Sequence, residues 1–518
     1  MKKYKVKLFC ALIALVSISN FAFSLDRGHS ILLEKGFQIQ GLCSPQMWGG
    51  GWPPVPPVQK PNMARFLESN FTGLNLLGNP YPELYFDEKP DIQWGRWANY
   101  NPSLRPEELP YLPTMVGFQY SDEENIGDPN VLEDANNWFR ATQLNYPNVI
   151  SFANQYGSQN TLAELQNFMV YCKPDMVCFD AYPFEGPYLS TYSGAWYYSN
   201  LAAYRTLGLG GHDGTGAEPI PYAMYLETYA RAGHTPSESE MRLNMFSALT
   251  FGYKFVQAFV YTSAWDGGPM PSILFTSLDD QNPTAKFYEM AEINREARNL
   301  GSTLVRLLSK DLGVIKGIHA IDGGTEENNV PVKVWIANDP NNDPYITNIT
   351  ATYIESPTTR GDVFVGYFKP LVESDDGPDY ENEIYFMLFN GQCDPIADSN
   401  QTRQNIRINF DFGSSGITSL QRLNRDTGNV ETVTLANDGG SKYHLDLTLP
   451  GGTADLFKFN TGALFVRKPG VNCGVGADLN GDCVVNLLDF VILAENWHRC
   501  MDPAITNCEK PWFYRHVQ

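Results

Sequence analysis

Residues 221–231 read Pro-Tyr-Ala-Met-Tyr-Leu-Glu-Thr-Tyr-Ala-Arg, an apolar run of strand length that stops at the carboxylate of Glu227. A second apolar run, at 115–120, is followed after one serine by three acids, Asp122, Glu123 and Glu124. Strands of a parallel barrel carry their active-site residues at their C-terminal ends. Two strands that each end in a carboxylate therefore predict a hydrolase that works with paired carboxylates.

Short apolar runs alternate with helical stretches on both sides of this segment, as in a parallel sheet with crossover helices. The unit within 79–113 is the faintest, and its aromatic residues Trp94, Trp97 and Tyr100 are expected near the ligand side. Counting that unit, the fold class is α/β, with a (β/α)8 TIM barrel over 25–305. The predicted strands are 36–42, 73–77, 92–98, 115–120, 148–153, 175–180, 222–226 and 255–261.

The helix after the Glu227 strand has a predicted start and end. Thr235 is the expected N-cap and Pro236 the first helical residue, because proline lacks the N–H that a first turn leaves unbonded. The helix is predicted to run to residue 248.

The pattern changes after the barrel. Strands of alternating polarity, separated by Gly, Asn and Asp turns, are predicted at 332–337, 383–389, 406–412, 443–449 and 455–460. Alternation of this kind is typical of an antiparallel β-sandwich, which we assign to 306–466. It carries no cluster of acids, histidines or hydroxyls that indicates chemistry.

The first residues predict export. Four lysines, at positions 2, 3, 5 and 7, precede an apolar run at 8–16, and Ala22-Phe23-Ser24 forms a cleavage site between small residues. This is a Sec-type signal peptide over 1–24, too short to span a membrane, and no transmembrane segment follows. Its removal takes the net charge from −21 to −25, because four lysines leave. So acidic a protein is an unlikely partner for nucleic acid, and we expect it to be secreted, periplasmic or on the cell surface.

Eight of the nine cysteines remain after removal of the signal. Cys172 and Cys178 are close in sequence, but the second falls in a buried strand, so core thiols are expected there. The last fifty residues hold Cys473, Cys483, Cys500 and Cys508, which predicts a small disulfide-bonded module over 467–518.

That module contains a calcium-loop pattern. Oxygen ligands occupy positions 1, 3, 5, 9 and 12, and a main-chain carbonyl stands at 7, which is the spacing of an EF-hand-type Ca²⁺ loop. The predicted ligands are Asp478, Asn480, Asp482, Val484, Asn486 and Asp489. The loop resembles one repeat of a type I dockerin, although Cys483 replaces the usual glycine and no second loop follows. The resemblance implies a cohesin-like or cell-surface partner, and a purely structural calcium module is the alternative.

The acids of the barrel resemble those of a large clan of retaining (β/α)8 glycoside hydrolases. In that clan the acid/base and nucleophile glutamates end the fourth and seventh strands, as Glu123 and Glu227 do here. Phe179 to Pro183 and the run after Arg231 are similar to clan sequences as well. The resemblance implies hydrolysis of a plant or algal poly- or oligosaccharide without a catalytic cofactor. Asp122 stands where the clan usually has Asn, so either Glu123 or Glu124 could be the acid/base.

Other residues after strand ends are expected to line the substrate cleft. They are Asp122, Asn154, Tyr156, Asp180, Tyr182, Tyr261 and Trp265. His212 and His234 lie in loops and are expected to be hydrogen-bonded surface residues. A non-catalytic carbohydrate-binding barrel is an alternative interpretation, and so is a polysaccharide lyase. The lyase needs a Tyr or His base beside a cationic group, and no Arg/Lys cluster follows the strands.

Overall fold

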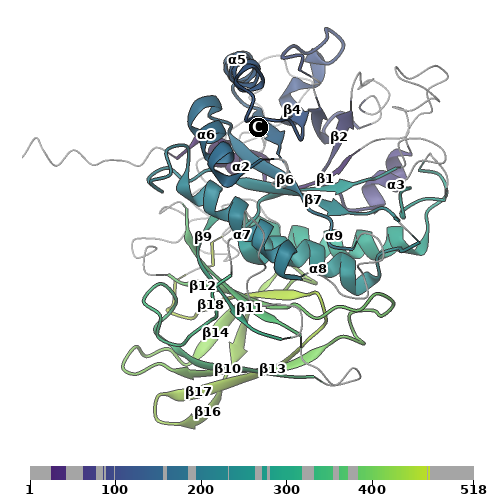
Figure 1. The fold of residues 1–518 in the computed structure, drawn as a ribbon. Coiled ribbons are helices and arrows are strands. Elements are labelled where there is room, and N and C mark those ends of the chain that lie inside the picture. The colour runs from purple at the N-terminus through teal and green to yellow at the C-terminus, as the bar shows by residue number, and fades with distance from the viewer. Residues whose placement is uncertain are drawn as a thin grey trace, which may run out of the picture.

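The computed structural model describes residues 25–42, 62–77, 86, 89–97, 100–155, 160–184, 194–231, 233–262, 271–276, 280–317, 332–353, 361–371, 383–463, 465 and 466 (Figure 1). The predicted signal peptide, the C-terminal module with its calcium loop and four cysteines, and the candidate residues Tyr156 and Trp265 lie outside these residues.

Eight parallel strands form a closed barrel in chain order, so the predicted TIM barrel is confirmed. The first strand pairs with the second and with the eighth, which closes the cylinder. The faint third strand is present and pairs with both neighbours. The strands are β1 (Gln38–Leu42), β2 (Gly73–Leu77), β3 (Gln93–Trp97), β4 (Met115–Asp122), β5 (Ile150–Asn154), β6 (Met176–Asp180), β7 (Tyr222–Glu227) and β8 (Phe255–Phe259).

Helices surround the barrel, and a 3-10 helix, η2 (Leu109–Thr114), leads into β4. They are α2 (Arg27–Lys35), α3 (Met63–Glu68), α5 (Pro129–Asn145), α6 (Leu162–Cys172), α7 (Gly194–Gly210), α8 (Glu238–Phe251) and α9 (Ala285–Leu304).

The predicted start of α8 at Thr235 and Pro236 is wrong. Ser237 is the N-cap, and its hydroxyl accepts a bond from the N–H of Glu240, while the Glu240 carboxylate accepts one from the N–H of Ser237. This capping box satisfies two N–H groups at once, which a threonine cap followed by proline does not do.

The barrel interior is partly polar. The hydroxyl of Tyr225 in β7 donates to the side chain of Gln119 in β4 at 2.5 Å, so these two side chains meet inside the cylinder. The side chains of Asn75 and Gln257 are also hydrogen-bonded to each other. Alternate residues of a strand point to opposite faces, so Gln119 and Tyr225 identify the inward set of their strands.

In the described residues after the barrel, ten antiparallel strands form a β-sandwich of two sheets. One sheet has the order β10-β13-β17-β16, and the other has the order β15-β14-β18-β12-β11-β9. The strands are β9 (Leu307–Ile315), β10 (Ile346–Tyr353), β11 (Val363–Pro370), β12 (Tyr385–Asn390), β13 (Gln404–Asp411), β14 (Ser419–Leu423), β15 (Val430–Thr434), β16 (Ala436–Gly439), β17 (Lys442–Leu449) and β18 (Ala454–Phe459).

The strand predicted at 332–337 does not form. Val334 makes only an isolated bridge to Val314 of β9. The indole of Trp335 is buried and donates to the hydroxyl of Tyr367 at 3.0 Å. The alternating pattern there therefore reflects one buried anchor and not a paired strand.

Helix α8 joins the two domains, since it lies between the barrel strands and the sandwich (Figure 1). Every residue from Ser239 to Phe251 is buried. One hydrophobic core includes barrel residues together with Phe364, Met387 and Leu456 of the sandwich. The approach is close, because a Cβ on Gly366 of β11 would lie 2.2 Å from the carbonyl oxygen of Thr250.

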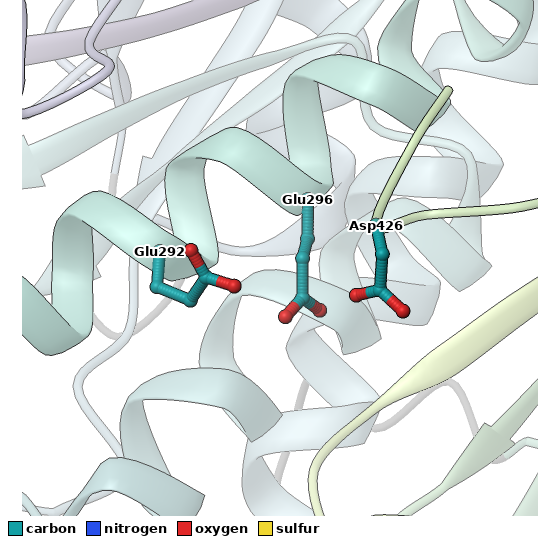
Figure 2. A group of neighbouring side chains, drawn as sticks. All are labelled: Glu292, Glu296 and Asp426. Carbon is teal, nitrogen blue, oxygen red and sulfur yellow. The ribbon is translucent and has the colours of Figure 1, made fainter. Parts of the chain in front are cut away.

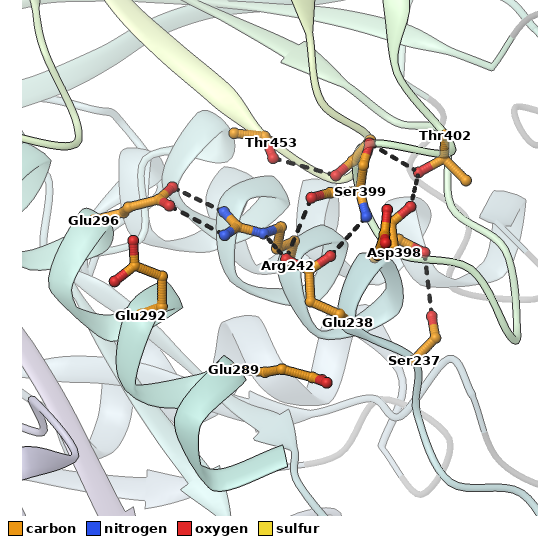
Figure 3. A network of polar contacts seen from close by, with 12 residues as sticks. Ser237, Glu238, Arg242, Glu289, Glu292, Glu296, Asp398, Ser399, Thr402 and Thr453 are labelled. Carbon is orange, nitrogen blue, oxygen red and sulfur yellow. Dashed lines mark hydrogen bonds and ion pairs between the residues drawn. The ribbon is translucent and has the colours of Figure 1, made fainter. Parts of the chain in front are cut away.

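Polar contacts fix the same interface (Figure 3). Arg242 of α8 donates to both carboxylate oxygens of Glu296 in α9, at 2.8 and 3.1 Å, and also binds Glu238. The carboxylate of Glu238 accepts from the N–H of Ser399 in the sandwich at 2.6 Å. The hydroxyl of Ser237 donates to the carbonyl of Asp394 at 2.6 Å. The start of α8 is therefore bonded to a loop of the sandwich.

Cys172, Cys178 and Cys393 are buried free thiols, which confirms the core-thiol prediction for the first two. Within the described ranges, no helix has both the length and the apolar character needed to cross a bilayer.

Candidate active site

A pocket of about 340 Å³ opens at the C-terminal ends of the barrel strands. Most of its lining residues are the last residue of a strand or the next few, which is the rim where active sites of this architecture lie. The lining residues are Leu42, Trp97, Asp122, Glu123, Asn154, Asp180, Ala181, Tyr182, Trp196, Tyr225, Arg231 and Phe259. The structure thus brings five of the candidate site residues, Asp122, Glu123, Asn154, Asp180 and Tyr182, together in one pocket.

The end of β4 distinguishes Glu123 from Glu124. Glu123 lines the pocket, whereas the Glu124 carboxylate accepts a bond from the hydroxyl of Tyr100. This bond raises the pKa of Tyr100 to about 12. The backbone of Glu123 has φ +52°, and its N–H donates to the carbonyl of Asn154 at 2.9 Å. A glutamate held in the left-handed region is uncommon, and such strain concentrates at functional sites.

Two aspartates share the pocket with Glu123. The side-chain amide of Asn154 donates to Asp122 Oδ1 at 2.7 Å and also hydrogen-bonds Asp180. Burial, together with the charges of Glu123 and Glu124, raises the pKa of Asp122 to about 6, although the hydrogen bond from Asn154 acts in the opposite direction. Burial, with the charges of Glu123 and Asp122, raises the pKa of Asp180 to about 8. Crowded carboxyls in a poorly solvated site hold protons in this way.

Glu227 ends β7 at the same rim and is only 2% exposed. Its Oε2 accepts from the N–H of Phe184 at 2.9 Å, and its own N–H donates to Oδ1 of Asn244 at 2.7 Å. Its carboxylate lies near the phenol of Tyr197, whose pKa rises chiefly through burial and slightly through this charge. Of the residues that the structure describes, those lining the pocket do not include Glu227.

Aromatic side chains form much of the remaining wall. Trp97, Trp196, Tyr182 and Phe259 line the pocket, and the rings of Tyr182 and Phe259 lie 5.8 Å apart. The expectation that Trp94 lies near the ligand side is wrong, because Trp94 is fully buried and its indole N–H donates to the carbonyl of Tyr111 at 2.8 Å.

Tyr261, predicted to line the cleft, lies elsewhere and is 1% exposed. Its ring packs against Phe66, Phe71 and Phe275, with centroids 5.8, 5.6 and 5.1 Å away. The chain turns after β8, and the N–H of Tyr261 donates to the carbonyl of Leu42 at 2.8 Å. That turn directs the ring into the core and away from the pocket.

Several lining residues were not among the predicted cleft residues. Tyr225 could have been found, because it lies two residues before Glu227 and alternation places the two on one face of β7. Trp196 and Arg231 come from a helix start and a loop, and no strand-end pattern identifies them. Both histidines are hydrogen-bonded as predicted: Nε2 of His212 contacts the carbonyl of Pro174 at 2.8 Å, and that of His234 contacts Glu240 at 2.9 Å.

A second group of carboxylates comes from α9 and from the sandwich. It consists of Glu292, Glu296 and Asp426 (Figure 2). Each is compensated by arginine. Arg242 and Arg425 bind Glu296, and Arg295 binds Glu292 and lies 3.7 Å from Asp426. The oxygens that would hold a metal ion are thus neutralised, and the group stabilises the contact between α9 and the sandwich.

No protein-family model matches this chain, and no curated protein matches it. Solved structures that resemble it include three glycoside hydrolases. One is a β-galactosidase from Bacillus circulans sp. alkalophilus, with a TM-score of 0.46 and 11% identity, where the match covers 82% of this chain and 99% of that one. Another is an α-galactosidase from Saccharomyces cerevisiae with raffinose, with a TM-score of 0.38 and 10% identity over 84% of this chain and 99% of that one. The third is an endo-β-1,4-mannanase from Thermotoga petrophila, with a TM-score of 0.35 and 9% identity over 82% of this chain and 99% of that one.

Proposed function

We propose that this protein is a glycoside hydrolase that cleaves a plant or algal poly- or oligosaccharide in the pocket at the strand ends. The observation that carries the proposal is the composition of that pocket. Three carboxyls, Asp122, Glu123 and Asp180, face the same space as the rings of Trp97 and Trp196. Carboxyls supply the acid, base or nucleophile of acetal hydrolysis, and indole rings offer flat apolar surfaces on which sugar rings stack.

The mechanism we propose is a retaining double displacement. Glu227 attacks the anomeric carbon and forms a glycosyl-enzyme ester, while Glu123 gives its proton to the departing glycosidic oxygen. Glu123 then takes a proton from water, and this water releases the sugar from Glu227. The position of Glu227 as the last residue of β7, at the rim where the pocket opens, supports its role as the nucleophile. Retaining enzymes hold the two carboxyls roughly 5 to 5.5 Å apart, so this mechanism requires that separation between Glu123 and Glu227 when substrate is bound.

The test is hydrolysis of a polysaccharide and aryl-glycoside panel by the wild type, Glu123→Gln and Glu227→Gln. We expect each variant to lose activity by a factor of about 10² or more, as for loss of an acid/base or nucleophile. Glu124→Gln is the matched control, because that carboxylate binds Tyr100, and it should keep most of the activity. NMR of the first product distinguishes retention from inversion. Full activity in either Gln variant removes the role of that residue.

A second candidate is a non-catalytic carbohydrate-binding barrel. It is favoured by the burial of Glu227, whose carboxylate is bonded to the main chain of Phe184 and lies off the pocket lining. This candidate would be supported if the wild-type protein binds an oligosaccharide in titration calorimetry but does not cleave it after prolonged incubation. A lyase is less well supported, since Arg231 is the single cationic residue among the described residues that line the pocket.

We also propose that the protein is exported with cleavage after Ser24 and that its C-terminal module binds Ca²⁺. These proposals rest on sequence patterns alone. N-terminal sequencing of the exported protein tests the first. Pull-down with cohesin domains, with and without a chelator, tests whether the module docks to a partner.

A further inference from the structure

The amide of Asn154 links two carboxyls of the pocket. It donates to Asp122 Oδ1 at 2.7 Å and also hydrogen-bonds Asp180. The other oxygen of Asp180, Oδ1, is buried and has no hydrogen-bond partner in the part of the chain that the structure describes. Asp180 itself lines the pocket. A buried polar atom without a partner is costly, so its presence at a pocket indicates either a ligand or a proton on that carboxyl.

The charges around Asp180 favour the proton. Asp122 and Glu123 approach from β4, and Cys178 and Tyr182 flank it on its own segment. Tyr225 of β7 and Arg231, after β7, are the other titratable or charged residues that line the pocket among those the structure describes. Within that described lining, three carboxyls share the pocket with one guanidinium. Neighbouring carboxylates in a poorly solvated site cannot all ionise together, and one of them keeps its proton.

We propose that Asp180 is a carboxylic acid in the resting enzyme at neutral pH, and that its proton controls the protonation state of Glu123. The inference deepens the proposed function and rests on it for the role of Glu123. Asp180 is a positioning residue in this scheme. The side chain of Asn154, which hydrogen-bonds both Asp122 and Asp180, holds it in place. The burial and neighbouring charge that raise the pKa of Asp180 to about 8 agree with this assignment.

The scheme predicts how the pH profile responds to Asp180→Asn. Asparagine has the shape of the neutral acid and cannot ionise, so the variant mimics the form that we assign. We expect kcat/KM below pH 6 to fall by less than about tenfold, because the neutral state is preserved. The alkaline limb should move to lower pH by about one unit, because Glu123 no longer shares its titration with a second carboxyl. Asp213→Asn, an exposed carboxylate on the same barrel, should leave the profile unchanged.

Infrared spectroscopy tests the proton without any substrate. In protein with ¹³C-labelled aspartate at pH 7, we expect a protonated-carboxyl C=O band that titrates near pH 8. The band should disappear in Asp180→Asn and remain in Asp213→Asn. This readout stands even if the wild type hydrolyses no glycoside, so failure of the proposed function is separable from failure of this inference.

Two results would overturn it. One is the absence of a protonated aspartate band at pH 7 in the wild type. The other is a folded Asp180→Asn protein, checked by circular dichroism, that loses activity at least 100-fold at every pH. That loss would mean that Asp180 acts in its ionised form.

Discussion

The ion pair between Arg96 and Glu108 allows a quantitative prediction. Arg96 in β3 is 2% exposed and Glu108 is fully buried, with Nη1 and Oε2 2.9 Å apart. Oε2 of Glu108 also accepts from the N–H of Arg105 at 2.6 Å, and the Arg96 guanidinium lies 5.7 Å from the ring centre of Phe118. Burial lowers the pKa of Arg96, and the charge of Glu108 opposes that shift. The next residue, Trp97, lines the pocket, so the pair holds a pocket wall in place.

Glu108→Leu leaves a buried guanidinium without its counter-charge and the N–H of Arg105 without its acceptor. Removing one partner of a buried pair costs about 3–5 kcal/mol, and replacing both with apolar residues is often close to neutral. We therefore expect Glu108→Leu to lower the free energy of unfolding by about 3–5 kcal/mol. The double variant Arg96→Met/Glu108→Leu should cost less than Glu108→Leu alone.

Urea unfolding followed by tryptophan fluorescence measures these values. Arg407 and Asp446 provide the control, since they form a two-bond pair at 2.6 Å with exposures of 50% and 57%. Arg407→Ala should cost less than about 1 kcal/mol, as exposed pairs do. The reasoning is refuted if Glu108→Leu costs no more than Arg407→Ala, or if the double variant costs the sum of its single substitutions.

Three further predictions concern other parts of the molecule. Lys254 is buried, its side-chain amine donates to the carbonyls of Leu304 and Leu307, and burial lowers its pKa to about 7. Because the unfolded chain keeps this proton up to about pH 10.4, the free energy of unfolding of the wild type should rise between pH 7 and 10 by up to about 1.4 kcal/mol per pH unit relative to Lys254→Met. Urea unfolding that shows the same pH dependence in both proteins would contradict the assignment. Arg242→Met should leave Glu296 and Glu238 undercompensated and lower the melting temperature of barrel and sandwich together, and calorimetry that shows the sandwich unfolding alone would oppose this. Asp478→Ala should abolish Ca²⁺ binding to the C-terminal module in titration calorimetry, and a wild type that binds no Ca²⁺ at millimolar concentration ends that prediction.

Much of the barrel could be predicted from the sequence, because apolar residues follow a different pattern in buried strands than in the helices that cover them. Even the faint β3 formed, since its neighbours on both sides supply backbone partners for a short strand. The early strands of the sandwich were harder. β9 and β11 were missed because they are buried along most of their length and show no clean alternation of polarity. The pattern at 332–337 alternates but has only a single bridge.

The candidate acids could be identified from the predicted strand ends, but the contacts around each carboxylate could not be predicted. That Glu123 and not Glu124 lines the pocket depends on a left-handed backbone and on Tyr100, which lies more than twenty residues away in the chain. The burial of Glu227 depends on where the segment after β6 places the N–H of Phe184. Side-chain direction at a strand end is set by tertiary contacts that a single sequence does not display.

Helix α8 has no side that faces water, and this has a practical consequence. A protein cut at the boundary between Leu304 and Leu307 would expose the apolar surface that Phe364 and Leu456 now cover, and the Glu238 carboxylate would lose its bond from the N–H of Ser399. Exposed apolar patches of this kind promote aggregation. The sandwich therefore belongs to the minimal folding unit, and any effort to express, evolve or transplant the pocket should carry residues 25–466 as one piece.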